Sequence, residues 1–254
     1  MELGIKGKWA LITGGTQGIG LAIAEELAAE GVNLLLASRS KKNIDAATDR
    51  VKKKFPGVSV LGVEVDLLDA GKLEKAIGKI AQEHSIDILV NNVGGPAAGL
   101  ALSISLEDWD KGYQSLIRSA LMMTKAFTPG MKAKKWGRVL TVTSTSAREI
   151  IPRLPVSSTF RSGLSALTKI LAKEVGREGI LINNLLPGPT DTGRLEELKV
   201  KDPAFFKAME TETAVGRVAA PAEIAKVAAF LVSNANTYLT GTDILADGGF
   251  TKAI

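Results

Sequence analysis

Three glycines near the start of the chain stand at a spacing that suits a nucleotide phosphate. Gly14, Gly18 and Gly20 form a T-G-x-x-x-G-x-G pattern that follows an apolar run, 9–12, and opens a helical pattern. Glycines let the backbone approach a diphosphate, and a helix N-terminus adds free N–H groups and positive dipole potential. We therefore expect a phosphate site rather than a turn that only caps a helix, with contacts from Gly14, Thr16, Gln17, Gly18, Ile19 and Gly20.

A second candidate position lies at the end of the next apolar run, 32–37. This run has the length of a buried strand, and Ser38, Arg39 and Ser40 follow it. In a doubly wound sheet the end of the second strand faces the adenosine ribose, where an acidic residue would bind a 2′-hydroxyl and an arginine a 2′-phosphate. Ser38 and Arg39 therefore favour NADP as the cofactor, and NAD stays an alternative if Arg39 is only a solvated loop residue.

On these motifs the chain resembles the short-chain dehydrogenase/reductase family, most nearly its β-ketoacyl-carrier-protein reductase branch. The resemblance covers almost the whole length, because three later segments are similar to family motifs. They are N-N-V-G at 91–94, P-G-x-x-x-T at 187–192 and D-G-G at 247–249. The resemblance implies a single-domain, doubly wound Rossmann-like α/β fold over 1–254, with a seven-stranded parallel sheet in the order 3-2-1-4-5-6-7.

The resemblance also implies which residues hold the cofactor. Asp66 would accept a hydrogen bond from the adenine amino group, unless it only caps the helix that begins near Asp69. The first asparagine of the 91–94 motif would brace the sheet, the glycines would leave room for the ribose, and Thr192 would hold the nicotinamide carboxamide. The implied contacts are Ser38, Arg39, Asp66, Leu67, Asn91, Asn92, Val93, Gly94, Pro187, Gly188 and Thr192.

The catalytic positions of the family are where this chain departs from the resemblance. The family uses a tyrosine acid, a lysine four residues later, a serine that polarises the carbonyl and an asparagine that anchors a water relay. The segment 163–169 is similar to the family's K-A-G-L-x-x-x-x-K stretch, and this alignment places the lysine at Arg161 and the tyrosine at Ser157. The serine matches Ser144, and the asparagine position falls on Leu116.

Only Ser144 keeps the residue type that the family uses. The two tyrosines, Tyr113 and Tyr238, lie elsewhere in the chain. The hydroxyl of Ser157 has far too high a pKa to replace a lysine-activated phenol, and Arg161 can donate to ribose hydroxyls but stays protonated. The usual tyrosine mechanism is therefore excluded, and the catalytic candidates are Ser144, Ser157 and Arg161.

Two classes of function fit these residues. The first is an atypical oxidoreductase that transfers a hydride between NADP(H) and a carbonyl or alcohol substrate. Ser144 and Ser157 would then bond the substrate oxygen, and Arg161 would supply positive charge. Arg148 and Arg153 would bind an anionic substrate, or they are ordinary surface arginines. The second class is a catalytically silent dinucleotide-binding protein that acts as a sensor or as a partner in an oligomer.

The elements that must position these residues alternate along the chain. Apolar runs predict strands at 9–12, 32–37, 58–65, 86–90, 139–143, 180–186 and 244–246. Helical patterns predict a long helix over 105–134 with Ser105 as N-cap, a second over 155–176, and a further helix that starts at Pro221. The segment 194–215 is expected to form a helical flap over the substrate.

Composition sets the outer limits of function. The chain has 254 residues, 45% of them hydrophobic, no cysteine and one histidine, His84. Disulfides and thiolate chemistry are excluded, and His84 is expected to be solvated at the polar end of a helix. Neither a serine–histidine triad nor a metal site is therefore supported. The net charge of +5 is spread over helix surfaces, which favours a solvated basic surface over nucleic-acid binding.

The expected setting is a cytoplasmic protein without membrane contact, because no run of 18 apolar residues and no signal pattern are visible. Long helices of the family also form subunit interfaces, so the resemblance implies a homo-oligomer, either a dimer or a homotetramer. The helix face that carries Leu164, Leu167, Ile170 and Leu171 is expected to be divided between the core and such an interface.

Overall fold

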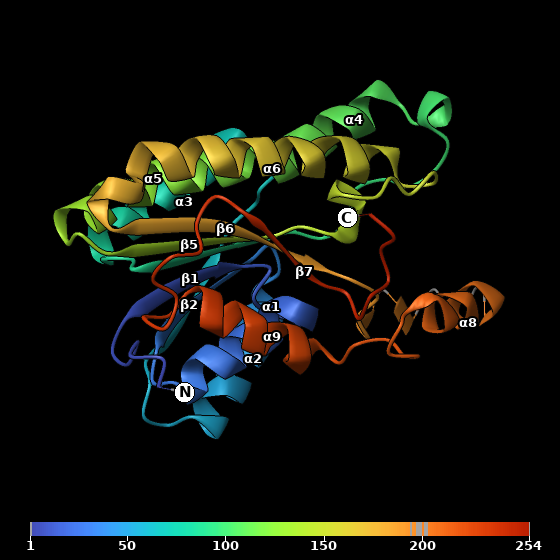
Figure 1. Cartoon of the computed structure of the whole chain (residues 1–254). Helices are drawn as coiled ribbons and strands as arrows, with labels where there is room; N and C mark the ends of the chain where they lie inside the picture. The colour runs from blue at the N-terminus through green and yellow to red at the C-terminus, as the bar shows by residue number, and fades with distance from the viewer. Residues whose placement is uncertain (1, 194, 197–199, 201–202, 254) are drawn as a thin grey trace.

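A seven-stranded parallel sheet forms the centre of the molecule (Figure 1). The computed structural model describes residues 2–193, 195–196, 200 and 203–253. The strands are β1 (Trp9–Thr13), β2 (Asn33–Ser38), β3 (Val60–Glu64), β4 (Ile88–Asn92), β5 (Gly137–Val142), β6 (Ile180–Pro187) and β7 (Asp243–Ala246). They lie in the order β3-β2-β1-β4-β5-β6-β7, which confirms the predicted α/β fold and strand order.

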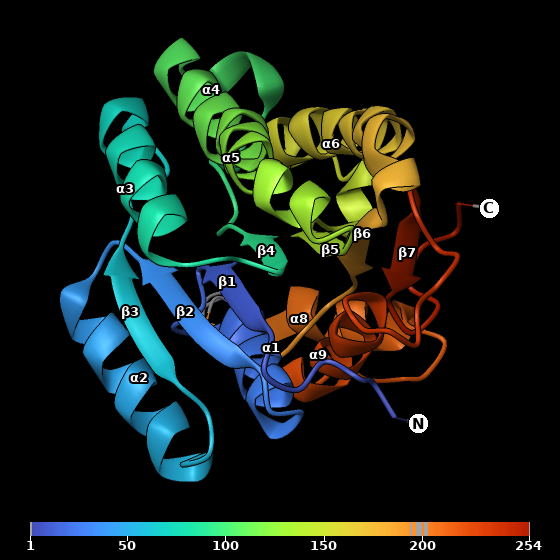
Figure 2. The ribbon, with the colours of Figure 1, turned by 90° about the vertical axis from the view of Figure 1, so that its left-hand side faces the viewer.

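Helices cover both faces of the sheet. They are α1 (Gly18–Ala29), α2 (Lys41–Lys54), α3 (Ala70–Glu83), α4 (Leu106–Tyr113), α5 (Ser119–Ala133), α6 (Pro155–Val175), α8 (Pro203–Glu212) and α9 (Pro221–Leu231). α1, α2 and α9 lie on one face, and α3, α4, α5 and α6 lie on the other (Figure 2). Alternate strand residues face the two layers: Ile12 belongs to the core cluster of α1 and α9, and Leu11 to that of α3 and α5.

The long helix predicted over 105–134 is interrupted in its middle. α4 and α5 are separated by a π-helical turn of five residues, Gln114–Arg118. Ser105 caps α4 as predicted, because its hydroxyl accepts a hydrogen bond from the Asp108 N–H at 3.1 Å. The predicted helix is therefore confirmed from Ser105 to Lys134, and the one widened turn inside it is a feature that the spacing of apolar residues does not reveal.

The other predicted elements are confirmed, with shifts of a few residues at their ends. Pro221 starts α9 as expected. The side chain of Asp69, and not that of Asp66, caps α3, since it accepts a backbone N–H of the first turn at 3.0 Å. His84 is half-buried, with its ring centroid 5.2 Å from that of Trp9, so the expectation of a solvated histidine was wrong. An aromatic neighbour from the start of β1 covers it.

The predicted flap, 194–215, contains α8, but positions 194, 197–199, 201 and 202 lie outside the described residues. In the part of the chain that is described, no helix is long and apolar enough to span a membrane.

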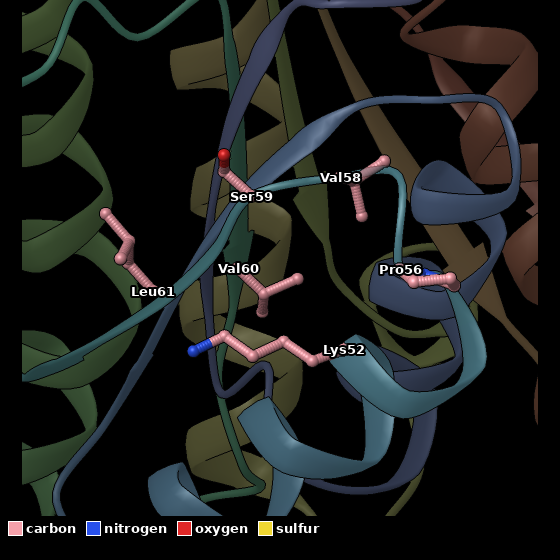
Figure 3. Close-up of a pocket in the computed structure, with 6 residues that line it drawn as sticks. All are labelled: Lys52, Pro56, Val58, Ser59, Val60 and Leu61. Carbon is pink, nitrogen blue, oxygen red and sulfur yellow. The ribbon is translucent and has the colours of Figure 1, made fainter.

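A hollow of about 430 Å³ lies at the edge strand β3, lined by Lys52, Pro56, Val58, Ser59, Val60 and Leu61 (Figure 3). None of the predicted site residues lines this hollow, so the candidate site lies elsewhere.

Candidate active site

The glycine turn between β1 and α1 forms an open cradle of backbone. Gly14 has a φ of +57°, and a Cβ there would lie 2.8 Å from the carbonyl oxygen of Asn92. A Cβ on Gly20 would lie 2.2 Å from the carbonyl oxygen of Gly14, so neither position accepts a side chain without a backbone shift. Among the described residues no side chain caps the first turn of α1, which leaves its N–H groups for a phosphate. The turn also contains a buried Thr16, an exposed Gln17 and a half-buried Ile19.

The loop after β6 meets this glycine turn. A Cβ built on Gly18 would lie 3.4 Å from Cγ2 of Thr192, so the two loops predicted to hold the phosphate and the carboxamide lie against each other. β6 ends at Pro187, and the Gly188 N–H donates to the carbonyl oxygen of Ala246 at 3.1 Å. The end of β7 therefore holds the start of this loop in place.

The end of β4 also lies against the glycine turn. Asn92 Nδ2 donates to the carbonyl oxygen of Gly14 at 3.2 Å. Asn91 is 3% exposed, and within the described residues its Nδ2 has no hydrogen-bond partner. Val93 is half-buried and Gly94 is exposed. Asn92 therefore joins β4 to the glycine turn, whereas Asn91, one position earlier in the strand, points to the other face of the sheet.

The end of β2 carries the residues predicted to contact the ribose. Ser38 is half-buried as the last residue of the strand, and Arg39 is exposed beside the N-terminus of α2. No ion pair of Arg39 is found in the described part of the chain, so its guanidinium is available to a 2′-phosphate. Asp66 and Leu67 are half-buried after β3, and the Asp66 carboxylate accepts the Leu68 N–H at 3.0 Å.

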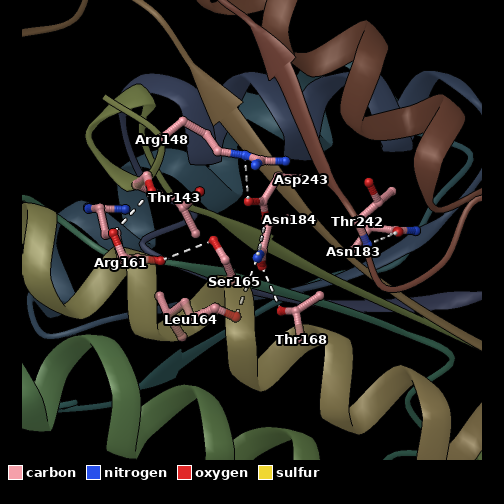
Figure 4. Close-up of polar contacts among 12 residues, drawn as sticks. Thr143, Arg148, Arg161, Leu164, Ser165, Thr168, Asn183, Asn184, Thr242 and Asp243 are labelled. Carbon is pink, nitrogen blue, oxygen red and sulfur yellow. Dashed lines mark hydrogen bonds and ion pairs between the residues drawn. The ribbon is translucent and has the colours of Figure 1, made fainter. Parts of the chain in front are cut away.

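Ser157 and Arg161 lie one turn apart on α6, and both are 5% exposed. Arg161 Nε donates to Ser157 Oγ at 3.1 Å, and one of its terminal nitrogens donates to the carbonyl oxygen of Val142 at 3.2 Å. Figure 4 shows Arg161 reaching from α6 toward the end of β5 at Thr143. The guanidinium is therefore held by protein groups, one of which is the Ser157 hydroxyl.

Ser144 opens a short 3-10 turn directly after β5. It is half-exposed, and its Oγ accepts the Ser146 N–H at 3.2 Å, which leaves the hydroxyl proton for a substrate oxygen. Ser146 is fully buried, and its Oγ lies 3.1 Å from Ser157 Oγ. The structure thus brings Ser144, Ser157 and Arg161 together through Ser146, which the sequence analysis missed. The one sequence feature that could have pointed to Ser146 is the run of three hydroxyl residues at 144–146.

Three further positions of interest lie outside this cluster. Leu116, which was predicted to stand at the family's asparagine position, is 2% exposed and packs in an apolar cluster with Leu164. Arg148 Nε lies 3.2 Å from Asp243 Oδ2 in an ion pair (Figure 4). Arg153 is exposed in the loop before α6, and the role of both arginines toward an anionic substrate stays a prediction.

Comparison with known proteins finds full-length relatives of this chain. A family model described as enoyl-(acyl carrier protein) reductase matches residues 14–251. The 3-oxoacyl-[acyl-carrier-protein] reductase FabG of Aquifex aeolicus (strain VF5) is 34% identical over 250 residues, which cover 98% of this chain and 99% of that protein.

Solved structures show the same fold. The L-sorbose reductase from Gluconobacter frateurii, complexed with NADPH and L-sorbose, superposes with a TM-score of 0.94 at 30% identity, and the match covers 100% of both chains. An NADPH-bound short chain oxidoreductase from Pseudomonas aeruginosa PAO1, described as containing an atypical catalytic center, has a TM-score of 0.89 at 26% identity. That match covers 97% of this chain and 98% of the other.

Proposed function

We propose a function for this chain from the premise that it belongs to the short-chain dehydrogenase/reductase family. It is an oxidoreductase that transfers a hydride between NADP(H) and a carbonyl or alcohol substrate. The observation that carries this proposal is the half-exposed Ser144 hydroxyl beside the buried pair of Ser157 and Arg161. These residues lie at the carboxyl edge of the parallel sheet, as the glycine cradle does.

The cofactor is proposed to be NADP(H), with NAD as the alternative. The glycine cradle would hold its diphosphate, and Arg39 would bind its 2′-phosphate. Asp66 would meet the adenine, and Thr192 would meet the nicotinamide carboxamide. When bound, NADPH supplies the hydride. The two solved relatives described above hold NADPH, which supports this choice.

The chain's own groups meet the charge that develops on the substrate oxygen. Ser144 Oγ accepts a hydrogen bond from the Ser146 N–H, so its own proton stays available, and Ser144 donates this proton in a hydrogen bond to the substrate oxygen. Arg161 is permanently protonated and adds positive potential through Ser157. A fixed donor of this kind typically contributes about 10²- to 10³-fold to the rate of the chemical step.

The catalytic centre is proposed to be atypical. Ser157, Arg161 and Leu116 stand where the family carries tyrosine, lysine and asparagine. The Pseudomonas relative described with an atypical catalytic center supports this view. We further propose that 1–254 acts as one dinucleotide-binding domain, that 194–215 covers the substrate, and that the protein assembles as a dimer or a homotetramer.

NADPH consumption over a substrate panel tests the proposal. The purified protein is mixed with NADPH and with ketones, dicarbonyls or β-ketoacyl thioesters, and the loss of NADPH absorbance is followed. Gly18→Arg is the cofactor-blind control, because its side chain would enter the space between Gly18 and Thr192. We expect substrate-dependent loss of NADPH in the wild type and none in this control.

Ser144→Ala separates chemistry from binding. Loss of this donor should lower kcat by about 10²-fold or more, whereas the Kd of NADPH from fluorescence titration should stay unchanged. Tight NADPH binding with no turnover of any panel member would speak against an oxidoreductase and for a silent dinucleotide-binding protein. No binding of either dinucleotide would contradict both functions.

A further inference from the structure

The proposed function makes no use of the Ser146 hydroxyl, although this group lies at the centre of the catalytic cluster. Ser146 is 0% exposed, and its Oγ lies 3.1 Å from Ser157 Oγ. Its N–H donates to Ser144 Oγ at 3.2 Å. One buried residue therefore contacts both hydroxyls that are proposed to serve the substrate, and the inference below rests on that proposed function.

The donors and acceptors around Ser157 Oγ determine whether the Ser146 hydroxyl can donate to it. A serine hydroxyl has one proton, which can rotate, and two acceptor positions. Arg161 Nε can only donate, so Ser157 Oγ accepts from it at 3.1 Å. Within the described residues, Ser157 Oγ is the only group in hydrogen-bond contact with Ser146 Oγ. When Ser146 donates, two donors converge on the Ser157 oxygen, and the proton of Ser157 is left for the substrate, directly or through one water.

Two donors at one oxygen matter most when that oxygen carries negative charge. As the carbonyl carbon gains the hydride, negative charge develops on the substrate oxygen, and Ser157 donates a hydrogen bond to it without giving up its proton. Part of the negative charge is then felt at the Ser157 oxygen, and the proton that completes the alcohol comes from water. A charge-assisted bond from Arg161 together with a bond from Ser146 stabilises that oxygen and so makes Ser157 a stronger donor.

We propose that Ser146 is a positioning residue whose hydroxyl is the second donor to the Ser157 oxygen, beside Arg161. It acts through Ser157 and does not touch the substrate. The backbone of the same residue keeps the Ser144 oxygen in place, so the short turn after β5 organises both hydroxyls.

A thiol at position 157 tests this proposal without any substrate. The chain has no cysteine, so Ser157→Cys introduces a single thiol, whose ionisation is followed by thiolate absorbance during a pH titration. Donors that stabilise an oxygen anion also stabilise a thiolate. Adding Ser146→Ala should therefore raise the thiol pKa by about one unit or more. The Ser146→Ala change keeps the N–H that contacts Ser144, so only the hydroxyl is removed.

Ser158→Ala is the matched control for this titration. Ser158 is also a buried serine, 6% exposed and adjacent to Ser157, but in the described part of the chain its Oγ has no hydrogen-bond partner. Its removal should leave the thiol pKa unchanged. The proposal would be overturned if the thiol pKa were the same with and without the Ser146 hydroxyl. It would also be overturned if Ser158→Ala raised the thiol pKa as much as Ser146→Ala does.

Turnover gives a second readout. With Ser157 intact, Ser146→Ala should lower kcat while the KM for NADPH stays constant, and Ser146→Thr, which keeps a hydroxyl, should restore part of the loss. If the wild type turns over no substrate, the proposed function fails, but the thiol titration still decides the role of Ser146. An unchanged kcat in Ser146→Ala would overturn the positioning role in an active enzyme.

Discussion

At the scale of single residues, Arg39 is expected to decide between the two dinucleotides. It is exposed at the end of β2, and a hydrogen bond to a charged partner contributes about 1.5–3 kcal/mol. Arg39→Asp should therefore weaken NADPH binding by roughly 10- to 150-fold. NADH binding should stay equal or become tighter, because a carboxylate can accept from the ribose 2′-hydroxyl. Fluorescence titration with both dinucleotides measures the two dissociation constants.

Arg177→Asp makes the same change of charge at the opposite edge of the sheet, where β6 begins. Arg177 is exposed, and its replacement reports the effect of net charge alone. The same loss of NADPH affinity in both variants would mean that Arg39 does not contact the 2′-phosphate.

Leu116 gives a second residue-scale prediction, because restoring the family's asparagine should harm this protein. The side chain is 2% exposed in a cluster with Ala120 and Leu164. Leu116→Asn should lower the free energy of unfolding by about 2–4 kcal/mol, since it buries an amide and leaves part of the leucine volume empty. Urea unfolding measures this loss, and Leu116→Met should cost less than about 1.5 kcal/mol. An asparagine variant of wild-type stability would contradict the apolar role.

A single residue can be predicted from the sequence where the local backbone conformation alone requires its residue type. Gly14 and Gly20 were predicted because a tight turn against a neighbouring chain leaves no room for a Cβ, and their spacing reports that need directly. Ser146 was not predicted, because its contact with Ser157 joins two elements, and their distance depends on how a short turn packs on α6. Neither the presence of a serine at 146 nor its spacing from Ser157 in the sequence predicts such a contact.

At the scale of elements, the turn after β7 holds the C-terminal segment. The Asp247 carboxylate accepts hydrogen bonds from the N–H and the hydroxyl of Thr251 at 3.0 and 2.8 Å, and from the Gly249 N–H at 3.0 Å. Partial burial alone would raise the pKa of Asp247, but these hydrogen bonds outweigh it and hold the pKa below its ordinary value of 3.8. The ionised carboxylate therefore stabilises this turn in the folded state.

Asp247→Asn should lower the free energy of unfolding by about 1 kcal/mol at neutral pH. Because the pKa is lower in the folded state, the contribution of the carboxylate is complete above the unfolded pKa and is lost as pH falls through the folded pKa. The difference between wild type and variant in urea unfolding should therefore be constant from about pH 5 to 7 and should shrink below about pH 4. A difference that grows on acidification would show that the ionised form does not stabilise the turn.

The elements themselves were largely predictable, because strand-length apolar runs alternate with helical patterns and parallel strands need helical crossovers. The family resemblance added the strand order that the structure confirms. The π-helical turn at 114–118 was not predictable from apolar spacing, since Leu116 is buried in it as it would be in a regular helix. The half-buried His84 was missed because its cover, Trp9, is 75 positions away in the chain.

At the scale of the whole molecule, apolar side chains stay exposed on the helical layer of α4, α5 and α6. Ile170 is 54% exposed, Tyr113 45% and Leu121 39%, whereas Leu164 on the same long helix is 2% exposed. These helices cover one face of the sheet together (Figure 2). Because the family resemblance implies subunit interfaces on the long helices, we expect these exposed apolar side chains to contact a second copy of the chain.

Ile170→Glu tests this expected interface, because a carboxylate buried without a partner costs several kcal/mol. Leu61→Glu is the control, since Leu61 is 39% exposed on β3 at the far edge of the sheet. Sedimentation equilibrium should give a multiple of the 26.7 kDa chain for the wild type and for Leu61→Glu, and a smaller mass for Ile170→Glu. A wild-type monomer would refute the homo-oligomer. An unchanged assembly in Ile170→Glu would mean that the interface does not include this face of α6, and the exposed Leu245 on the edge strand β7 would be tested next.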